Sequence, residues 1–128
     1  MSKNIPLHTP KFLGNEKKYL SQCIESSWLS SSGKFVKNFE EKISIFTKSK
    51  YAISCINGTS ALHLSLKLAG VKKNDEVITP TITFIAAVNV IKYLGANPIF
   101  MDCDNFLNLN IKKTIEFIKF NTYFRKGH

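Results

Sequence analysis

The sequence predicts an α/β fold in which two helices precede a mostly parallel sheet with three strands. Apolar residues recur at three- and four-residue steps up to about residue 47, a spacing typical of helices. From residue 51 onward, short β-rich runs alternate with helical runs, and Gly70, Pro80 and Gly95 separate them. The predicted order is therefore α-α-β-α-β-α-β-α, in which helices connect parallel strands.

The two N-terminal helices are predicted over about residues 15–28 and from Lys34 onward. Between them, the Ser-rich stretch WLSSSGKF contains Gly33 and is predicted to be a loop. Glu40 and Glu41 lie opposite the apolar stripe of the second helix, as expected for a solvated face. The stripes consist of Tyr19, Leu20, Cys23, Ile24 and Trp28 in the first helix and Phe35, Val36, Phe39, Ile43 and Phe46 in the second.

Strands are predicted at residues 51–56, 76–79 and 97–101. The first is a short run between turn residues and is expected to be a buried strand. Pro80 should stop the second strand, and Asp102 follows the third. Helices are predicted over residues 59–69, 83–94 and 111–120, with Gly70 as a candidate C-cap for the first of these.

Length and composition indicate one globular domain, because 44% of the 128 residues are hydrophobic and no repeat or linker is present. No apolar run approaches the roughly 18–20 residues of a membrane-spanning helix. The start, MSKNIPLHTPKF, has no secretory-signal pattern. The three cysteines form no C-x-x-C pair, so a reduced, cytoplasmic location is expected.

The net charge of +9 raises the alternative of a nucleic-acid-binding protein. Seventeen of the 18 basic residues are lysine, however, and Arg125 is the one arginine. Arginine provides the planar fork of donors that phosphates and bases favour, and the lysines here are spread along the chain. Solvated helix faces explain the charge better.

The stretch Asn57-Gly58-Thr59-Ser60 joins the first predicted strand to a helix and is a candidate phosphate site. The first N–H groups of a helix lack partners, and the helix dipole favours an anion there. Gly58 leaves room for close approach, and the two hydroxyls add donors. The alternative is an ordinary helix cap and turn. Neither the Walker pattern nor the G-x-G-x-x-G pattern occurs.

Phe84 follows the second strand at a similar junction, where an aromatic ring can stack on a flat ligand; the alternative is a core residue. Asp102 and Asp104 follow the third strand, and turn capping is favoured over metal binding because no further ligand lies at suitable spacing. His63 is expected to be packed or exposed, and neither it nor His8 and His128 indicates a catalytic triad or zinc site.

Five ordered blocks lie within about residues 28–102. The blocks are Ser32 (or Ser31) and Gly33 before Phe39 and Glu40; Asn57 to Leu62; Asn74 to Pro80; Thr83 to Ala86; and Gly95 to Asp102. Together they resemble the N-terminal part of the DegT/StrS-type sugar aminotransferases, which are pyridoxal-phosphate (PLP) enzymes of the aspartate-aminotransferase fold. The tail EFIKFNTYFRKG resembles the subgroup that makes 4-amino sugars for legionaminic-acid or bacillosamine-type glycans.

The resemblance implies roles for the matched positions. Such enzymes transfer an amino group from glutamate to a nucleotide-linked 4-keto-6-deoxy sugar, and they act as homodimers. The phosphate of PLP would be held by Gly58, Thr59 and Ser60, its ring would stack on Phe84, and the nucleotide sugar would lie near Trp28, Ser30 and Gly33.

The resemblance also implies that two catalytic groups lie past residue 128: the lysine that forms the Schiff base, and the carboxylate that pairs with the ring nitrogen. No lysine of this chain matches that motif, Asp102 belongs to an earlier block, and no catalytic residue or metal ligand is assigned. Residues 1–48 would supply helices and the substrate loop, and residues 49–128 the start of the PLP-binding large domain of fold type I.

The chain is therefore expected to be an incomplete, single partial domain that is inactive alone. Its first strand should lack its neighbours, which would leave edges and apolar faces exposed. Two other classes stay open: a small phosphate-ligand-binding α/β module without catalysis, and a basic nucleic-acid-binding protein.

Overall fold

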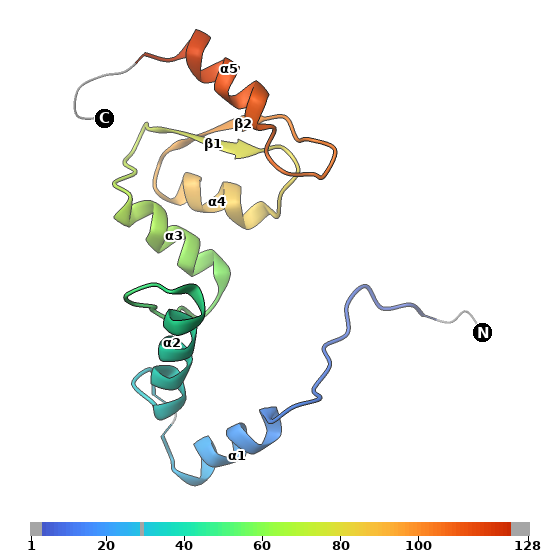
Figure 1. Cartoon of the computed structure of the whole chain (residues 1–128), viewed down its shortest axis with the longest axis vertical. Coiled ribbons are helices and arrows are strands. Elements are labelled where there is room, and N and C mark those ends of the chain that lie inside the picture. The colour runs from blue at the N-terminus through green and yellow to red at the C-terminus, as the bar shows by residue number, and fades with distance from the viewer. Residues whose placement is uncertain (1–3, 29, 124–128) are drawn as a thin grey trace. The chain divides into compact units, whose positions relative to one another are not determined.

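The computed structural model describes residues 4–28 and 30–123. The chain forms two compact units, one ending at Ser54 and the other beginning at Cys55. Figure 1 shows the order of the elements in both. Among the described residues, every helix is too short or too polar to span a bilayer. The assignment of the chain to one partial domain stays a prediction.

The first unit contains α1 (Glu16–Glu25) and α2 (Lys34–Thr47). The helix α1 is shorter than predicted, whereas α2 begins at the predicted residue. The rings of Tyr19 and Phe35 pack together, with centroids 5.1 Å apart, so the two apolar stripes meet in part. Lys48 ends α2 in a left-handed conformation with φ of 54°.

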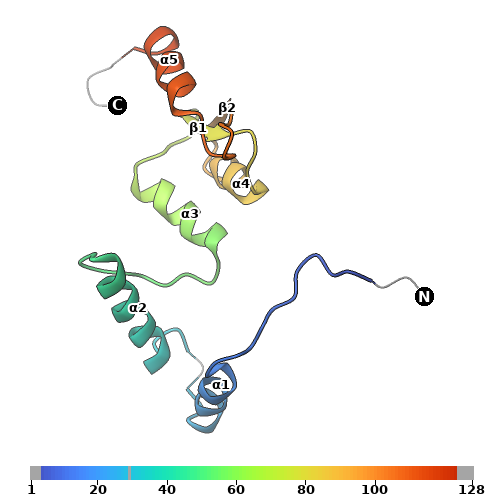
Figure 2. The ribbon, with the colours of Figure 1, turned by 45° about the vertical axis from the view of Figure 1, so that its right-hand side comes forward.

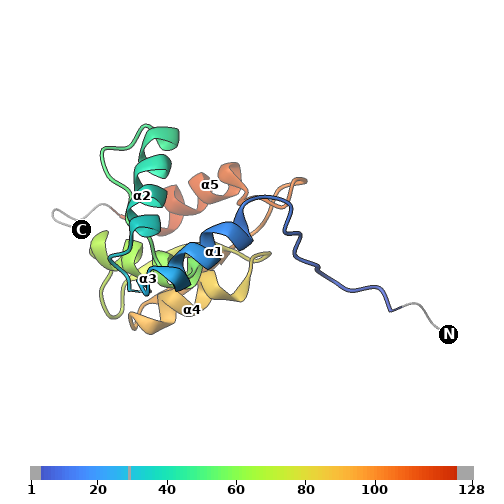
Figure 3. The ribbon, with the colours of Figure 1, turned by 90° about the horizontal axis from the view of Figure 1, so that it is seen from below.

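The second unit contains a parallel sheet of two strands, β1 (Glu76–Pro80) and β2 (Asn97–Met101). The register pairs Glu76 with Asn97 and Ile78 with Ile99. The helix α4 (Ile85–Tyr93) connects the strands and lies between the sheet and α3 (Gly58–Leu68), as Figures 1 and 2 show. Figure 3 shows α3 and α4 from below. The last helix, α5, covers Ile111–Asn121.

The core of the second unit is small and centres on α4. Val90, Ile91 and Ala96 are almost fully buried, with 1%, 2% and 0% of their surface exposed. Gly70 and Gly95 follow the ends of α3 and α4 with φ of +88° and +73°, values that favour glycine. These positions confirm the predicted helix ends.

The prediction of a buried strand at residues 51–56 is wrong. These residues form no strand in the structure, and the side chains of Tyr51, Ile53 and Ile56 are 75%, 76% and 92% exposed. A strand forms only when a neighbouring segment accepts and donates its backbone hydrogen bonds, and no described segment pairs with this one. The described sheet therefore has two strands rather than three, and the expected exposure of this segment is confirmed.

Candidate functional site

The turn that begins α3 leaves two backbone donors available. Asn57 is the N-cap, and its Oδ1 accepts a hydrogen bond from the N–H of Ser60 at 2.8 Å. Among the described residues, the N–H groups of Gly58 and Thr59 have no hydrogen-bond partner. Since the helix dipole adds partial positive charge at this end, the turn can accept an anion. The helix begins at Gly58, one residue earlier than predicted.

Gly58 leaves space beside this turn. A Cβ atom placed on Gly58 would meet no heavy atom within 4 Å, so packing does not account for a glycine here. The side chains of Thr59 and Ser60 are half-buried, and their hydroxyls have no hydrogen-bond partner among the described residues. These features fit a phosphate group, since its oxygens need several donors and close access to the backbone.

Phe84 lies at a comparable position at the start of α4. It is the N-cap of that helix and 80% of its surface is exposed, so the alternative of a core residue is wrong. In Figure 1, α3 and α4 both begin on the right-hand side, toward which β1 and its parallel partner β2 run. Ligands of open α/β sheets bind at this end of the strands. The two predicted junctions, at the starts of α3 and α4, therefore lie toward the same end of the sheet.

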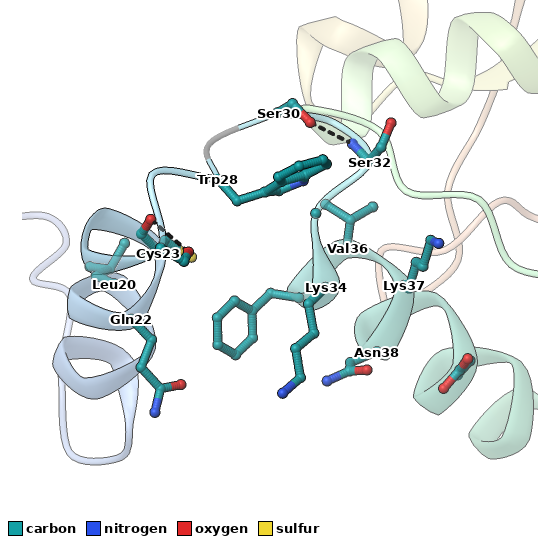
Figure 4. A pocket seen from close by; sticks show the side chains of 14 residues that line it. Leu20, Gln22, Cys23, Trp28, Ser30, Ser32, Lys34, Val36, Lys37 and Asn38 are labelled. Carbon is teal, nitrogen blue, oxygen red and sulfur yellow. Dashed lines mark hydrogen bonds between the residues drawn. The ribbon is translucent and has the colours of Figure 1, made fainter.

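The first unit contains a pocket of about 830 Å³ between α1, the loop after it, and α2. Its wall includes Trp28, Ser30 and Gly33, which were the three candidate substrate residues, and Figure 4 shows the labelled side chains around it. Sequence reasoning missed several polar residues of the wall, although helical spacing groups most of them on α2. Those with amide or charged side chains are Gln22, Lys34, Lys37, Asn38 and Glu41.

The loop keeps its shape because Gly33 is a glycine. This residue is buried, and a Cβ on it would lie 3.1 Å from Cδ1 of Trp28 and 3.3 Å from the carbonyl oxygen of Ser30. The N–H of Gly33 donates to that same carbonyl at 3.2 Å. The indole therefore packs directly against the backbone, in a pocket whose wall also carries cationic, amide and carboxylate side chains. Such a pocket suits a flat ring that carries an anionic group.

The two aspartates after β2 have structural partners. Asp104 accepts hydrogen bonds from the N–H groups of Phe106 and Asn108, both at 2.9 Å, which confirms the predicted turn capping. Asp102 forms an ion pair with Lys113 on α5. The hydrogen bond from Lys113 and another from the N–H of Cys103 lower the pKa of Asp102, and the carboxylate raises the pKa of Lys113.

His63 packs against an aromatic ring, as the sequence predicted. Its ring lies edge-on to the ring of Tyr93, with centroids 6.0 Å apart, and the contact joins α3 to α4. The described residues contain no group of three or more His, Cys, Asp or Glu side chains arranged to hold a metal ion.

A parallel sheet whose helices begin at its carboxyl end is typical of α/β proteins that bind ligands there. The chain belongs to the DegT/DnrJ/EryC1/StrS aminotransferase family, which it matches over residues 11–124. It is 48% identical over 103 residues to the GDP-perosamine synthase of Escherichia coli O157:H7. That match covers 80% of this chain and 28% of the relative, so the chain spans little more than a quarter of that protein's length.

Solved structures agree with the family. The chain superimposes on E. coli GDP-4-keto-6-deoxy-D-mannose-3-dehydratase with bound hydrated PLP with a TM-score of 0.78 and 27% identity, covering 88% of this chain and 31% of that one. A mutant GDP-4-keto-6-deoxymannose-3-dehydratase with bound GDP-perosamine gives a TM-score of 0.76 and 28% identity, again covering 88% and 31%. Together with the family match, these structures show that the chain has part of the fold of the PLP-dependent sugar aminotransferases. No comparison tests the resemblance of the tail to the legionaminic-acid or bacillosamine subgroup, which stays a prediction.

Proposed function

We propose that this chain provides the phosphate-binding turn and a wall of the substrate pocket of a PLP-dependent aminotransferase that acts on a nucleotide-linked 4-keto-6-deoxy sugar. Family membership and the GDP-sugar names of its relatives support this function. One observation on the chain itself carries it: Asn57 caps α3 through Ser60, and the amides of Gly58 and Thr59 lie beside open space with no partner in the described part of the chain.

Each candidate residue has a distinct role in this proposal. The amides of Gly58 and Thr59 and the hydroxyls of Thr59 and Ser60 hold the phosphate of PLP. Phe84 stacks on the ring of the cofactor through its exposed side chain. When bound, PLP supplies an electron sink for the transfer of the amino group.

The pocket of the first unit binds the nucleotide sugar in this proposal. Its aromatic wall, Trp28, suits a flat base or sugar face, and the charge of Lys34 and Lys37 suits a diphosphate. Ser30 and Gly33 shape the loop through their backbone contact. Family resemblance alone supports three further proposals, namely glutamate as amino donor, a homodimeric assembly and a cytoplasmic location.

A binding experiment tests the phosphate turn. The probe is pyridoxine 5′-phosphate, which lacks the aldehyde of PLP and therefore does not condense with the 17 lysines. We expect the backbone amide signals of Gly58 and Thr59 in the ¹⁵N-labelled 128-residue chain to shift with the probe and not with pyridoxine. Gly58→Val should abolish the shifts because its side chain fills the open space. The matched control is Gly14→Val, where the nearest atoms belong to the flexible side chain of Glu16.

A chimera tests the proposed aminotransferase activity. Residues 11–124 of this chain replace the matching segment of the E. coli O157:H7 GDP-perosamine synthase, and formation of GDP-perosamine is measured. We expect a chimera that binds PLP and forms product, and loss of both in its Gly58→Val variant. A folded chimera without PLP would contradict the proposal, and PLP binding without product would favour the alternative of a non-catalytic phosphate-binding module.

A further inference from the structure

We propose that Glu40 is a positioning residue for the phosphate-binding turn, which it controls by fixing the backbone of Ser54. This inference rests on the function proposed above. Ser54 lies three residues before Asn57, the N-cap of α3, and is the last residue of the first unit. Glu40 lies on α2, 14 residues earlier in the chain.

The contact between these residues involves one carboxylate oxygen and two donors. Oε1 of Glu40 accepts a hydrogen bond from the backbone N–H of Ser54 at 2.8 Å and another from its hydroxyl at 2.9 Å. Because both donors belong to Ser54, the contact fixes the backbone and the side chain of this residue together. Hydrogen bonds to a charged acceptor are stronger than neutral ones.

The surrounding segment has little else to hold it. Among the described residues, the N–H of Ser54 is the one backbone donor of residues 51–56 that has a hydrogen-bond partner. The neighbouring side chains of Ile53 and Ile56 are 76% and 92% exposed, whereas Ser54 and Glu40 are half-buried. Apart from the carbonyl oxygen of Tyr51, which accepts a hydrogen bond from the hydroxyl of Ser49 at 3.0 Å, Glu40 provides the hydrogen bonds of this segment among the described residues.

The carboxylate of Glu40 has no other hydrogen-bond or ion-pair partner in the described part of the chain. The ion pair found there joins Asp102 to Lys113 and does not involve Glu40. The N–H of Ser54, followed by its hydroxyl, lowers the pKa of Glu40, so the carboxylate is charged at neutral pH and the contact persists there. These observations separate Glu40 from Glu41, which lines the pocket of the first unit.

Loss of the contact between Glu40 and Ser54 should weaken phosphate binding without changing any donor. The amides of Gly58 and Thr59 lie four and five residues after Ser54, so a fixed Ser54 limits the freedom of the segment that enters α3. A free segment must be ordered when the anion binds, and this ordering lowers affinity.

The experiment measures binding of pyridoxine 5′-phosphate to the 128-residue chain through the amide shifts of Gly58 and Thr59. We expect Glu40→Ala to weaken binding about tenfold, as loss of hydrogen bonds to a charged group predicts. Glu40→Gln keeps an acceptor oxygen and should restore most of the affinity, together with the amide shift of Ser54. Glu25→Ala is the matched control, since it removes the same charge from an exposed position on α1.

The outcomes distinguish this inference from the proposed function. If the unmodified chain does not bind the probe, both the proposed phosphate-binding turn and the role of Glu40 are overturned. If it binds and Glu40→Ala binds equally well, only the role of Glu40 is overturned. Equal losses in Glu40→Ala, Glu40→Gln and Glu25→Ala would indicate an effect of net charge and would also overturn it. If Glu40→Ala does not fold, Ser54→Ala is the variant to test. It removes one of the two hydrogen bonds and should weaken binding by a smaller factor. Unchanged affinity in Ser54→Ala would overturn the inference.

Discussion

The side chain of Asn57 holds the N–H of Ser60 at 2.8 Å, and this hydrogen bond starts α3 at Gly58. The bond satisfies one donor at the end of the helix and leaves the two before it for a ligand. In the function proposed above, the helix cap and ligand binding therefore depend on different groups within one turn of helix, and a substitution can separate them.

Asn57→Ala should destabilise α3 by about 1 kcal/mol, the usual cost of losing a side-chain cap. Amide hydrogen exchange measures it, with faster exchange expected in the first turns of α3. Asn57→Asp is the control, because aspartate also accepts the hydrogen bond and should retain the protection. Equal exchange in Asn57→Ala and the unmodified chain would show that the cap does not stabilise this helix.

The ion pair of Asp102 and Lys113 should make the docking of α5 depend on pH. The pKa of Asp102 lies below its ordinary value of 3.8, so its contribution is present above that value and is lost as the pH falls through the lowered pKa. The pKa of Lys113 lies above its ordinary value of 10.5, so its contribution is present below 10.5 and is lost as the pH rises through the raised pKa. Amide shifts of α5 should therefore be constant between these limits.

Lys113→Gln tests this assignment, because it removes the positive partner and keeps a long side chain. Both side chains are more than half exposed, so water and salt screen the pair and the effect should shrink at high ionic strength. If the α5 signals of this variant still change at acidic pH as they do in the unmodified chain, the change is due to another group.

Gly33→Ala should displace the indole of Trp28, the one tryptophan of the chain. The added Cβ would lie 3.1 Å from the indole and 3.3 Å from a backbone carbonyl oxygen, and the backbone cannot move aside cheaply. We expect the fluorescence emission to shift to longer wavelength as the ring becomes more solvated. Gly14→Ala, which faces a flexible carboxylate, should leave the emission unchanged. Identical spectra for both variants would show that Gly33 does not hold the indole in place.

Local patterns predicted most elements but not their pairing. The start of α2 at Lys34 and the bounds of β2 agree with the sequence, since apolar spacing and turn residues are local signals. Residues 51–56 have the composition of a strand, yet strand formation depends on a partner that local sequence does not contain.

In the candidate site, too, local features could be predicted from the sequence and long-range contacts could not. A short motif identified Gly58, and the family resemblance implied a role for Trp28; they lie at an open turn and in a pocket wall. The sequence assigned Glu40 to a solvated face, because its contact with Ser54 arises only when the chain after α2 returns along that helix. Spacing within one helix does not report such a contact.

Ile91→Ala should destabilise the second unit strongly, by about 2–5 kcal/mol, because it opens a cavity in a core that has few members. Ile91 is 2% exposed and lies on α4, the helix that contacts both strands and α3. Ile85→Ala on the same helix is the matched control, since that side chain is 61% exposed and should cost far less. Hydrogen exchange of the β1 and β2 amides measures the difference, because α4 covers this sheet. Similar protection in the two variants would mean that α4 does not stabilise the sheet and that the phosphate turn on α3 lacks this support.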